Sequence, residues 1–165
     1  MQKVAISPNK PGLRERALAY LSRREYSYQE LQHKLRLYAQ DCDDKNQLDD
    51  DITALLEDFK KRGWLSEQRY AEQIVHARKA RFGSLRVANE LRGHGVSEEV
   101  VAKALAEVKH DEVANARSIC RKKYGAAPQN REQWAKQARF LQSRGFSFEV
   151  IKQALRDDPD EFNRK

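Results

Sequence analysis

Residues 88–105, ANELRGHGVSEEVVAKAL, carry the most informative pattern in the sequence, because it returns fifty residues later. The second copy is ARFLQSRGFSFEVIKQAL, residues 138–155, and eight of the eighteen aligned positions are identical without a gap. The identities fall where a helix needs apolar residues three and four apart, where a glycine can end a helix, and where a serine can begin the next one. The repeat therefore predicts two copies of a helix–turn–helix unit.

Four serines have the surroundings of a helix N-cap. They are Ser27, Ser66, Ser97 and Ser147, and each directly follows one apolar residue and precedes another by four positions. In this hydrophobic staple the serine oxygen accepts a backbone N–H, and the apolar pair fixes the angle at which the chain enters the helix. A glycine stands shortly before three of these serines: Gly63, Gly95 and Gly145. Glycine suits the left-handed residue that ends a helix, so each unit is expected to be a helix, a tight turn and a second helix.

Outward from these units, apolar residues three and four apart recur along nearly the whole chain, and no run alternates with period two. We therefore expect an all-α fold. Nine helices are expected, at residues 13–24, 27–39, 50–62, 66–80, 84–93, 97–108, 111–124, 130–144 and 147–156.

We expect these helices to form three tandem three-helix, helix-turn-helix-like repeats. The repeats cover residues 13–63, 64–108 and 109–158, between a flexible N-terminal tail at 1–12 and an acidic, polar C-terminal tail at 159–165. A unit of about 45 residues buries too little apolar surface to be robust alone. The repeats should therefore stack into an elongated, curved, solenoid-like body.

Composition narrows the class of partner and compartment. The 165 residues are 39% apolar and 35% charged, with a net charge of +7. This balance favours nucleic acid, a nucleoprotein or an acidic protein surface as the partner, although a solvated surface of lysines and arginines would give the same balance.

The cysteines and the apolar stretches bear on the compartment. Cys42 and Cys120 form no CxxC and are far apart, which indicates a reducing compartment. With no signal-peptide pattern and no apolar stretch long enough for a bilayer, we expect a cytoplasmic protein without a membrane partner.

The sequence offers no pattern for catalysis, a cofactor or a metal. It has no glycine-rich phosphate loop, and its histidines and cysteines lack ligand spacing. Trp64 and Trp134 are expected in the core rather than stacked on bases. Phe82 and Tyr124, which precede glycines, are expected to be C-cap contacts rather than exposed stacking groups. We therefore expect a non-enzymatic binding protein that works as a monomer without cofactor or metal.

Positive charge concentrates in the second half of the chain. Residues 41–58 hold eight acids and one lysine (net −7), residues 76–93 five bases and one acid (net +4), and residues 113–156 ten bases and two acids (net +8). The acids at 49–51 are expected to precede a helix, where its dipole favours them. Eight cations are the candidate partner-binding residues, facing acidic protein or DNA phosphate: Arg78, Lys79, Arg81, Arg86, Arg92, Arg121, Lys122 and Lys123. For those in the last turn of a helix, the alternative is that they only complement the dipole.

Four blocks of sequence, taken together in their order along the chain, resemble the RecX family, and the resemblance covers residues 13–156. The main block is RYAEQIVHARKARFGSLRVANELRGHGVSEEVVAKAL at 69–105. The others are RALAYLSRREYSYQELQHKL at 16–35, FKKRGWLSEQRYA at 59–71 and ARFLQSRGFSFEVIKQAL at 138–155. Where the family usually has Gly-Pro, this chain has Gly83-Ser84, and Ser84 is able to cap the helix instead.

The resemblance implies tandem three-helix units that bind the RecA recombinase, above all in the helical groove of its filament on single-stranded DNA. It also implies inhibition of RecA's ATPase, strand-exchange and co-protease activities, and thereby modulation of recombination, DNA repair and the SOS response. Weak direct contact with DNA stays open. Two alternatives are a helix-turn-helix regulator that binds DNA itself, and a helical adaptor for another protein. The acids at 98, 99 and 149, just after two of the caps, speak against the first because they repel phosphate.

Overall fold

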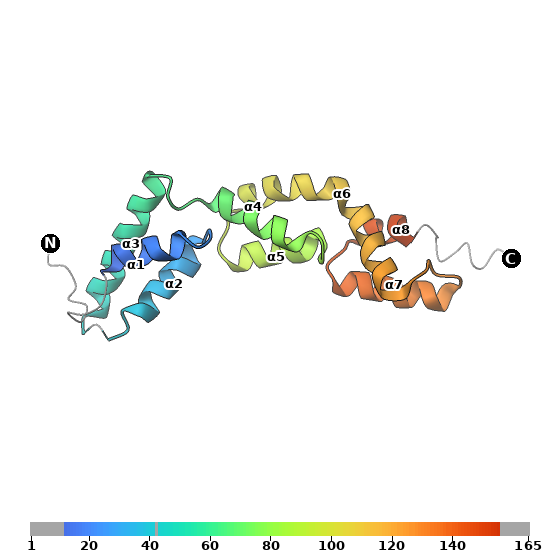
Figure 1. Ribbon diagram of the computed structural model, residues 1–165, viewed down its shortest axis with the longest axis horizontal. Helices are drawn as coiled ribbons and strands as arrows, with labels where there is room; N and C mark the ends of the chain where they lie inside the picture. The colour runs from blue at the N-terminus through green and yellow to red at the C-terminus, as the bar shows by residue number, and fades with distance from the viewer. Residues whose placement is uncertain (1–11, 42, 156–165) are drawn as a thin grey trace. The chain divides into compact units, whose positions relative to one another are not determined.

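The computed structural model of the chain describes residues 12–41 and 43–155, which fold into eight helices without a strand (Figure 1). The all-α prediction is confirmed. The helices are α1 (Leu13–Leu21), α2 (Tyr28–Tyr38), α3 (Lys45–Lys61), α4 (Glu67–Arg78), α5 (Ser84–Gly93), α6 (Glu98–Tyr124), α7 (Arg131–Ser143) and α8 (Phe148–Leu155). Apart from Gly12, the predicted tails at 1–12 and 159–165 lie outside the described residues, as does Cys42.

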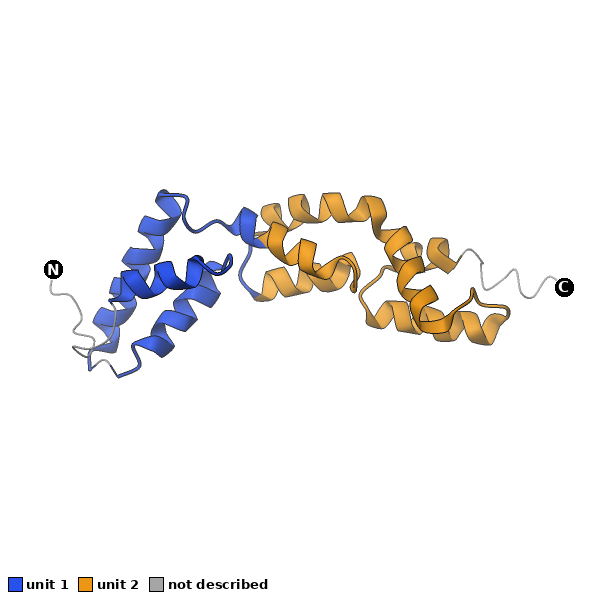
Figure 2. Ribbon diagram, in the orientation of Figure 1, with its two compact units in different colours: residues 1–70, 94–96 blue, residues 71–93, 97–165 orange. Residues whose placement is uncertain are grey.

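The chain divides into two compact units, coloured separately in Figure 2. Unit 1 consists of residues 1–70 and 94–96, and unit 2 of residues 71–93 and 97–165. Helices α1, α2 and α3 belong to unit 1, while α5, α6, α7 and α8 belong to unit 2. The predicted division into three repeats stays a prediction, and its boundary after residue 108 falls inside α6.

Serine caps begin the helices largely as predicted. The Ser27 hydroxyl accepts the Glu30 N–H at 3.1 Å, and the Glu30 carboxyl accepts the Ser27 N–H at 3.3 Å, which completes a capping box. The hydroxyls of Ser66 and Ser147 each accept the backbone N–H three residues further on, both at 3.3 Å. Ser97 occupies the N-cap position of α6, but its side chain makes no capping hydrogen bond. The predicted cap is therefore confirmed in full at three of the four serines.

The predicted turn glycines and staples are confirmed as well. Gly63, Gly95 and Gly145 have φ of 71°, 75° and 85°, in the left-handed region that a side chain disfavours. The eight apolar residues that flank the four serines are each at most 6% exposed. They are Tyr26, Leu31, Leu65, Tyr70, Val96, Val101, Phe146 and Ile151. The turns at Gly63, Gly95 and Gly145 are thus fixed twice, by backbone conformation and by burial of an apolar pair.

The prediction of nine helices was wrong, because the expected helices at 97–108 and 111–124 form one helix, α6. Its 27 residues contain neither glycine nor proline, so nothing in the backbone interrupts it. Val108, Glu112, Ala116 and Cys120 are all buried and stand four apart, which gives the helix one continuous buried stripe across the expected break. The repeat pattern predicts a turn at this position, whereas the local sequence favours a continuous helix.

Two smaller expectations also failed. Helix α3 begins at Lys45, so the acids at 49–51 lie within it rather than before it. The Asp44 carboxyl caps that earlier start by accepting the Gln47 N–H at 3.0 Å. Trp64 is 41% exposed and packs edge-on against Phe59, with ring centroids 5.4 Å apart, whereas Trp134 is buried as expected.

Each unit has its own core. In unit 1, side chains of α2 and α3 are fully buried against each other, among them Leu31, Leu35, Ile52 and Phe59. In unit 2, Figure 1 shows α5 beside the first half of α6, and α7 and α8 beside its second half. The second half of α6 contributes Cys120, which packs among apolar residues of α7 and α8. Burial raises the pKa of the Cys120 thiol to about 11, so little reactive thiolate forms near neutral pH.

Two turns of unit 2 meet through their backbones. The Gly83 N–H, before α5, donates to the Arg144 carbonyl at 2.9 Å, and the Leu85 N–H donates to the Gly145 carbonyl at 3.1 Å. A Cβ on Gly83 would collide with the Gly145 carbonyl, and a Cβ on Gly145 would collide with Arg86. Both positions therefore require glycine, Gly145 also because of its positive φ.

A buried acid caps the start of α5. Ser84 is the first residue of this helix and does not stand at the expected cap position. Its N–H donates instead to the carboxyl of Glu112 on α6, at 2.7 Å, and Glu112 is only 3% exposed. The backbone N–H at the start of α5 is therefore satisfied by a carboxyl from a distant part of the chain, twenty-eight residues further on.

The contact between the two turns predicts a steric effect at Gly83. Gly83→Ala should lower the free energy of unfolding by about 1–3 kcal/mol, the usual cost of forcing a group into a packed site. Gly93→Ala is the control, because a Cβ there meets nothing within 4 Å. It should leave stability unchanged or raise it by up to about 1 kcal/mol through helix propensity. Urea denaturation followed by circular dichroism measures both, and equal stability of the two variants would contradict the contact.

The buried carboxyl predicts a second stability effect. Glu112→Ala leaves the Ser84 N–H buried without its acceptor, which should cost about 1–3 kcal/mol. Glu112→Gln retains an acceptor oxygen and should cost less than the alanine variant. Glu107→Ala, at an exposed position of the same helix, is the control for lost charge. Thermal unfolding ranks the three variants, and similar losses for Glu112→Ala and Glu107→Ala would refute the capping role.

Candidate functional site

The eight predicted partner-binding cations all lie in unit 2, but they differ in how much charge they leave available. Arg78 at the end of α4 pairs with Glu90 at 2.9 Å, and Arg92 at the end of α5 pairs with Glu98 at 2.6 Å. The hydrogen bond from Arg92 lowers the pKa of the Glu98 carboxyl, which keeps that carboxyl ionised. The positive charge of these two arginines is therefore largely compensated by neighbouring acids.

The other six cations fall into separate places. Lys79 and Arg81 are exposed in the turn after α4. Arg121 and Lys122 are exposed near the end of α6, where they line a shallow hollow together with Arg117. Arg117 is held by hydrogen bonds from its guanidinium to the carbonyls of residues 153 and 154, at 2.8 and 3.2 Å. The two remaining cations belong to a more ordered arrangement.

Cations and aromatic rings alternate across unit 2 in what we call the cation–aromatic row. It consists, in order, of Arg86, Phe82, Arg144, Phe140, Lys123, Tyr124 and Lys136. Its residues come from the turn before α5, from α5, from the end of α6 and from α7 with the turn that follows it. Segments far apart in the sequence thus contribute to one surface feature.

Each cation of the row lies within 6.0 Å of a ring centroid. The Arg86 guanidinium carbon is 4.3 Å from the Phe82 centroid, and the Arg144 guanidinium carbon lies 5.5 Å from Phe82 and 5.3 Å from Phe140. The Lys123 ammonium is 4.1 Å from the Phe140 centroid. These separations are those of cation–π contacts, which are worth about 0.5–1 kcal/mol each at exposed sites.

The second half of the row continues onto Tyr124. Lys123 and Lys136 lie 5.6 and 6.0 Å from the Tyr124 centroid. The rings of Tyr124 and Phe140 meet edge to face, with centroids 5.6 Å apart. Tyr124 and Phe140 also pack against the core formed by α6, α7 and α8, so the rings are anchored from below.

Helical spacing and the contact between the two turns place the row. Residues 136, 140 and 144 stand four apart, which puts them on one face of α7 and its C-cap. At the other end, the backbone contact of Gly83 with Arg144 holds the segment of Phe82 and Arg86 against α7. The Arg86 guanidinium also donates to the Ser143 carbonyl at 3.4 Å.

The rings hold the cations in place without neutralising them. Among the residues that the structure describes, none of the four cations of the row forms an ion pair with an acid. A set of fixed positive charges loses little side-chain freedom when an anion arrives, so more of the attraction remains as affinity. Phosphate or carboxylate groups are the partners that such an array can bind, and rings between the charges can also stack on bases.

Sequence reasoning found only part of this feature. Arg86 and Lys123 were among the chosen cations, while Lys136 and Arg144 were counted in the local charge but not chosen. Tyr124 packs against the core as expected of a C-cap contact. Phe140 was missed, although its position four residues from cations on either side was a signal in the sequence. The contribution of Phe82 and Arg86 depends on a contact between distant turns that local spacing does not encode.

Within residues 12–41 and 43–155, no group of three or more histidines, cysteines and acids is placed to hold a metal ion. In that same part of the chain, no helix is both long and apolar enough to cross a bilayer.

Comparison with known proteins gives concordant matches. Two family models match, one described as the third three-helix domain of RecX over residues 110–155 and one as its second three-helix domain over 66–105. A regulatory protein RecX from Herbaspirillum seropedicae is 42% identical over 153 residues, which cover 89% of this chain and 95% of the relative. One from Neisseria meningitidis is 33% identical, covering 94% and 96%. The crystal structure of RecX from Lactobacillus salivarius shares the fold, with a TM-score of 0.71 at 19% identity, over 90% of this chain and 95% of that one.

The row predicts a salt-dependent interaction with polyanions. Lys123→Glu combined with Lys136→Glu should weaken binding of a fluorescein-labelled oligothymidylate and flatten its dependence on salt. Each lost phosphate contact should reduce the slope of log K against log salt by about 0.7 for a single strand. Lys45→Glu combined with Lys61→Glu changes net charge equally in unit 1 and is the matched control. Fluorescence anisotropy at several salt concentrations measures both, and equal losses would mean that net charge alone is responsible.

Proposed function

The chain belongs to the RecX family of regulatory proteins, and on that basis we propose that it binds the RecA recombinase and modulates its activity. The preferred target is the RecA filament on single-stranded DNA, in whose helical groove the chain lies. Binding there inhibits RecA's ATPase, strand-exchange and co-protease activities, and so restrains recombination, DNA repair and the SOS response.

The observation that carries this proposal is the cation–aromatic row. A filament of protein on single-stranded DNA offers phosphates and acidic side chains close together, and the row offers four fixed cations free of acids among the described residues. The basic hollow of Arg117, Arg121 and Lys122 adds to the same positive character of unit 2. Both features fit a polyanionic partner better than a neutral one.

The same proposal covers how the chain acts. It is a regulator without catalysis of its own, works in the cytoplasm as a monomer, and needs no cofactor. Its effect comes from occupying the filament rather than from changing RecA covalently.

Direct contact with the DNA strand is a second candidate activity, and the rings of the row favour it because bases stack on aromatic side chains. Reading of the major groove by a helix-turn-helix is less well supported. The helices that follow the caps begin with acids, Glu98 and Glu99 in α6 and Glu149 in α8, which repel phosphate.

The proposal predicts a direct effect on RecA. Equimolar protein should slow ATP hydrolysis by RecA on single-stranded DNA, because a chain seated in the groove hinders filament growth. A coupled assay of ADP release measures the rate. The Lys123→Glu, Lys136→Glu variant should inhibit less than the Lys45→Glu, Lys61→Glu control. An ATPase rate that the wild-type chain leaves unchanged would refute the proposed function.

A further inference from the structure

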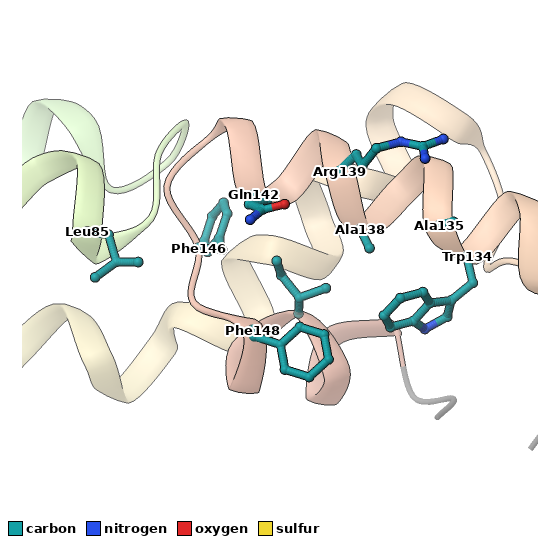
Figure 3. Close-up of a pocket in the computed structure, with 9 residues that line it drawn as sticks. Leu85, Trp134, Ala135, Ala138, Arg139, Gln142, Phe146 and Phe148 are labelled. Atoms are coloured by element: carbon teal, nitrogen blue, oxygen red, sulfur yellow. The ribbon is translucent and has the colours of Figure 1, made fainter. Parts of the chain in front are cut away.

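A groove with apolar walls lies between α7 and α8 of unit 2, beside the start of α5. Its main walls are Leu85, Trp134, Ala138, Phe146, Phe148 and Ile151, and its volume is about 360 Å³. Figure 3 shows Trp134 at one end, Leu85 at the other, and Phe148 on α8 facing the side chains of α7. We call this feature the apolar groove. The size lies within the range of about 300–1,000 Å³ that is usual for binding pockets.

Two large apolar side chains of this groove remain exposed, although the Phe148 ring meets the Trp134 ring edge to face, with centroids 6.4 Å apart. Phe148 is 58% exposed and Leu85 is 53% exposed. Phe148 follows the Ser147 cap, and in the aligned copy of the repeat the same position holds Glu98, which is exposed and charged. The turn and the staple therefore form equally well with a charged residue there. An aromatic ring at this position costs solubility and calls for an explanation outside folding.

The positive charge at the rim of the groove indicates the charge of the segment that binds there. Arg139 lines the groove, and the Lys152 ammonium lies 5.7 Å from the Phe148 ring centroid. Residues 131–155 carry five bases and only two acids, Glu132 and Glu149. An apolar group flanked by carboxylates therefore matches the groove, whereas a basic segment would be repelled.

We infer that the apolar groove receives a bulky apolar side chain of the recombinase, carried on a segment with acidic residues beside it. The inference rests on the proposed function and names the protein-binding part of unit 2. The anchor side chain packs against the exposed faces of Phe148 and Leu85, beside the edge-to-face pair of Trp134 and Phe148, and the neighbouring carboxylates face Arg139. A buried aromatic or aliphatic anchor with a charged rim is the usual arrangement of a protein–protein hot spot.

The apolar groove and the cation–aromatic row adjoin at one turn. Arg144 belongs to the row and Phe146 to the groove, with Gly145 between them. Leu85, at the far end of the groove, is fixed to this turn by its hydrogen bond to the Gly145 carbonyl. Unit 2 thus offers two adjoining surfaces of different chemistry, one for phosphate and one for protein. A nucleoprotein is the partner that uses both.

The test separates protein binding from DNA binding. Phe148→Ala and Leu85→Ser are measured in the full chain against two probes, RecA without DNA and a fluorescein-labelled oligothymidylate. Leu37→Ser is the matched control, because Leu37 is 54% exposed and belongs to unit 1. Phe148→Leu, which keeps a bulky apolar group, tests for rescue. Since the mutated side chains are more than half exposed, circular dichroism should show each variant folded.

We expect Phe148→Ala and Leu85→Ser each to weaken RecA binding by about tenfold or more, as hot-spot truncations do. Oligothymidylate binding should stay within about twofold of wild type because the row remains intact. Phe148→Leu should recover most of the affinity, and Leu37→Ser should change neither binding.

Four results would overturn the inference. If wild-type chain binds RecA and both groove variants bind it equally well, the groove is not the contact, although the proposed function survives. If the groove variants lose oligonucleotide binding to the same extent, nucleic acid fills the groove instead. If sedimentation shows a wild-type dimer that Phe148→Ala converts to a monomer, a second copy of the chain fills it. Failure of the wild-type chain to bind RecA at all would remove the proposed function together with the inference.

Discussion

The two proposed binding surfaces of unit 2 are joined by one backbone contact, in which the turn at Gly83 lies directly against the turn at Gly145. Two hydrogen bonds join them, and neither turn has room for a Cβ at its glycine. Because the backbones touch, Phe82 and Arg86 come within reach of Arg144, and the cation–aromatic row becomes continuous from α5 to α7. The same contact sets Leu85 at the end of the apolar groove. In a chain that formed the same helices but kept these turns apart, the row would lose Phe82 and Arg86 and the groove would lose Leu85.

Charge in this protein has two separate uses. Several arginines are matched to acids and stabilise local structure: Arg36 with Asp49 at 2.7 Å, Arg78 with Glu90 at 2.9 Å and Arg92 with Glu98 at 2.6 Å. Exposed pairs of this kind are screened by water and contribute little, so they adjust the fold rather than hold it together. The cations of the row rest on rings instead, which fixes their positions and leaves their charge for a partner. A count of lysines and arginines in the sequence does not separate these two uses, because acids and rings reach them from other helices.

Sequence rules succeeded wherever the cause is local. An N-cap needs one serine and the next few residues, a left-handed turn needs one glycine, and a staple needs an apolar pair; Ser27, Gly145 and the pair of Phe146 and Ile151 all obey these rules. The rules failed where a distant residue decides. Glu112, twenty-eight residues away, caps α5 in place of Ser84, and a buried stripe carries α6 through an expected break. For the site, the spacing of Lys136, Phe140 and Arg144 was visible in the sequence, whereas the turn contact that adds Phe82 and Arg86 was not.

Hydrogen–deuterium exchange of the full chain, with and without the RecA filament on single-stranded DNA, measures which helices the filament covers. If the surface built around the Gly83–Gly145 contact binds the filament, exchange should slow in residues 82–86 and throughout α7 and α8. The helices α1, α2 and α3 should keep the rates of the free chain. Protection confined to α1, α2 and α3, with α7 and α8 unaffected, would contradict the account.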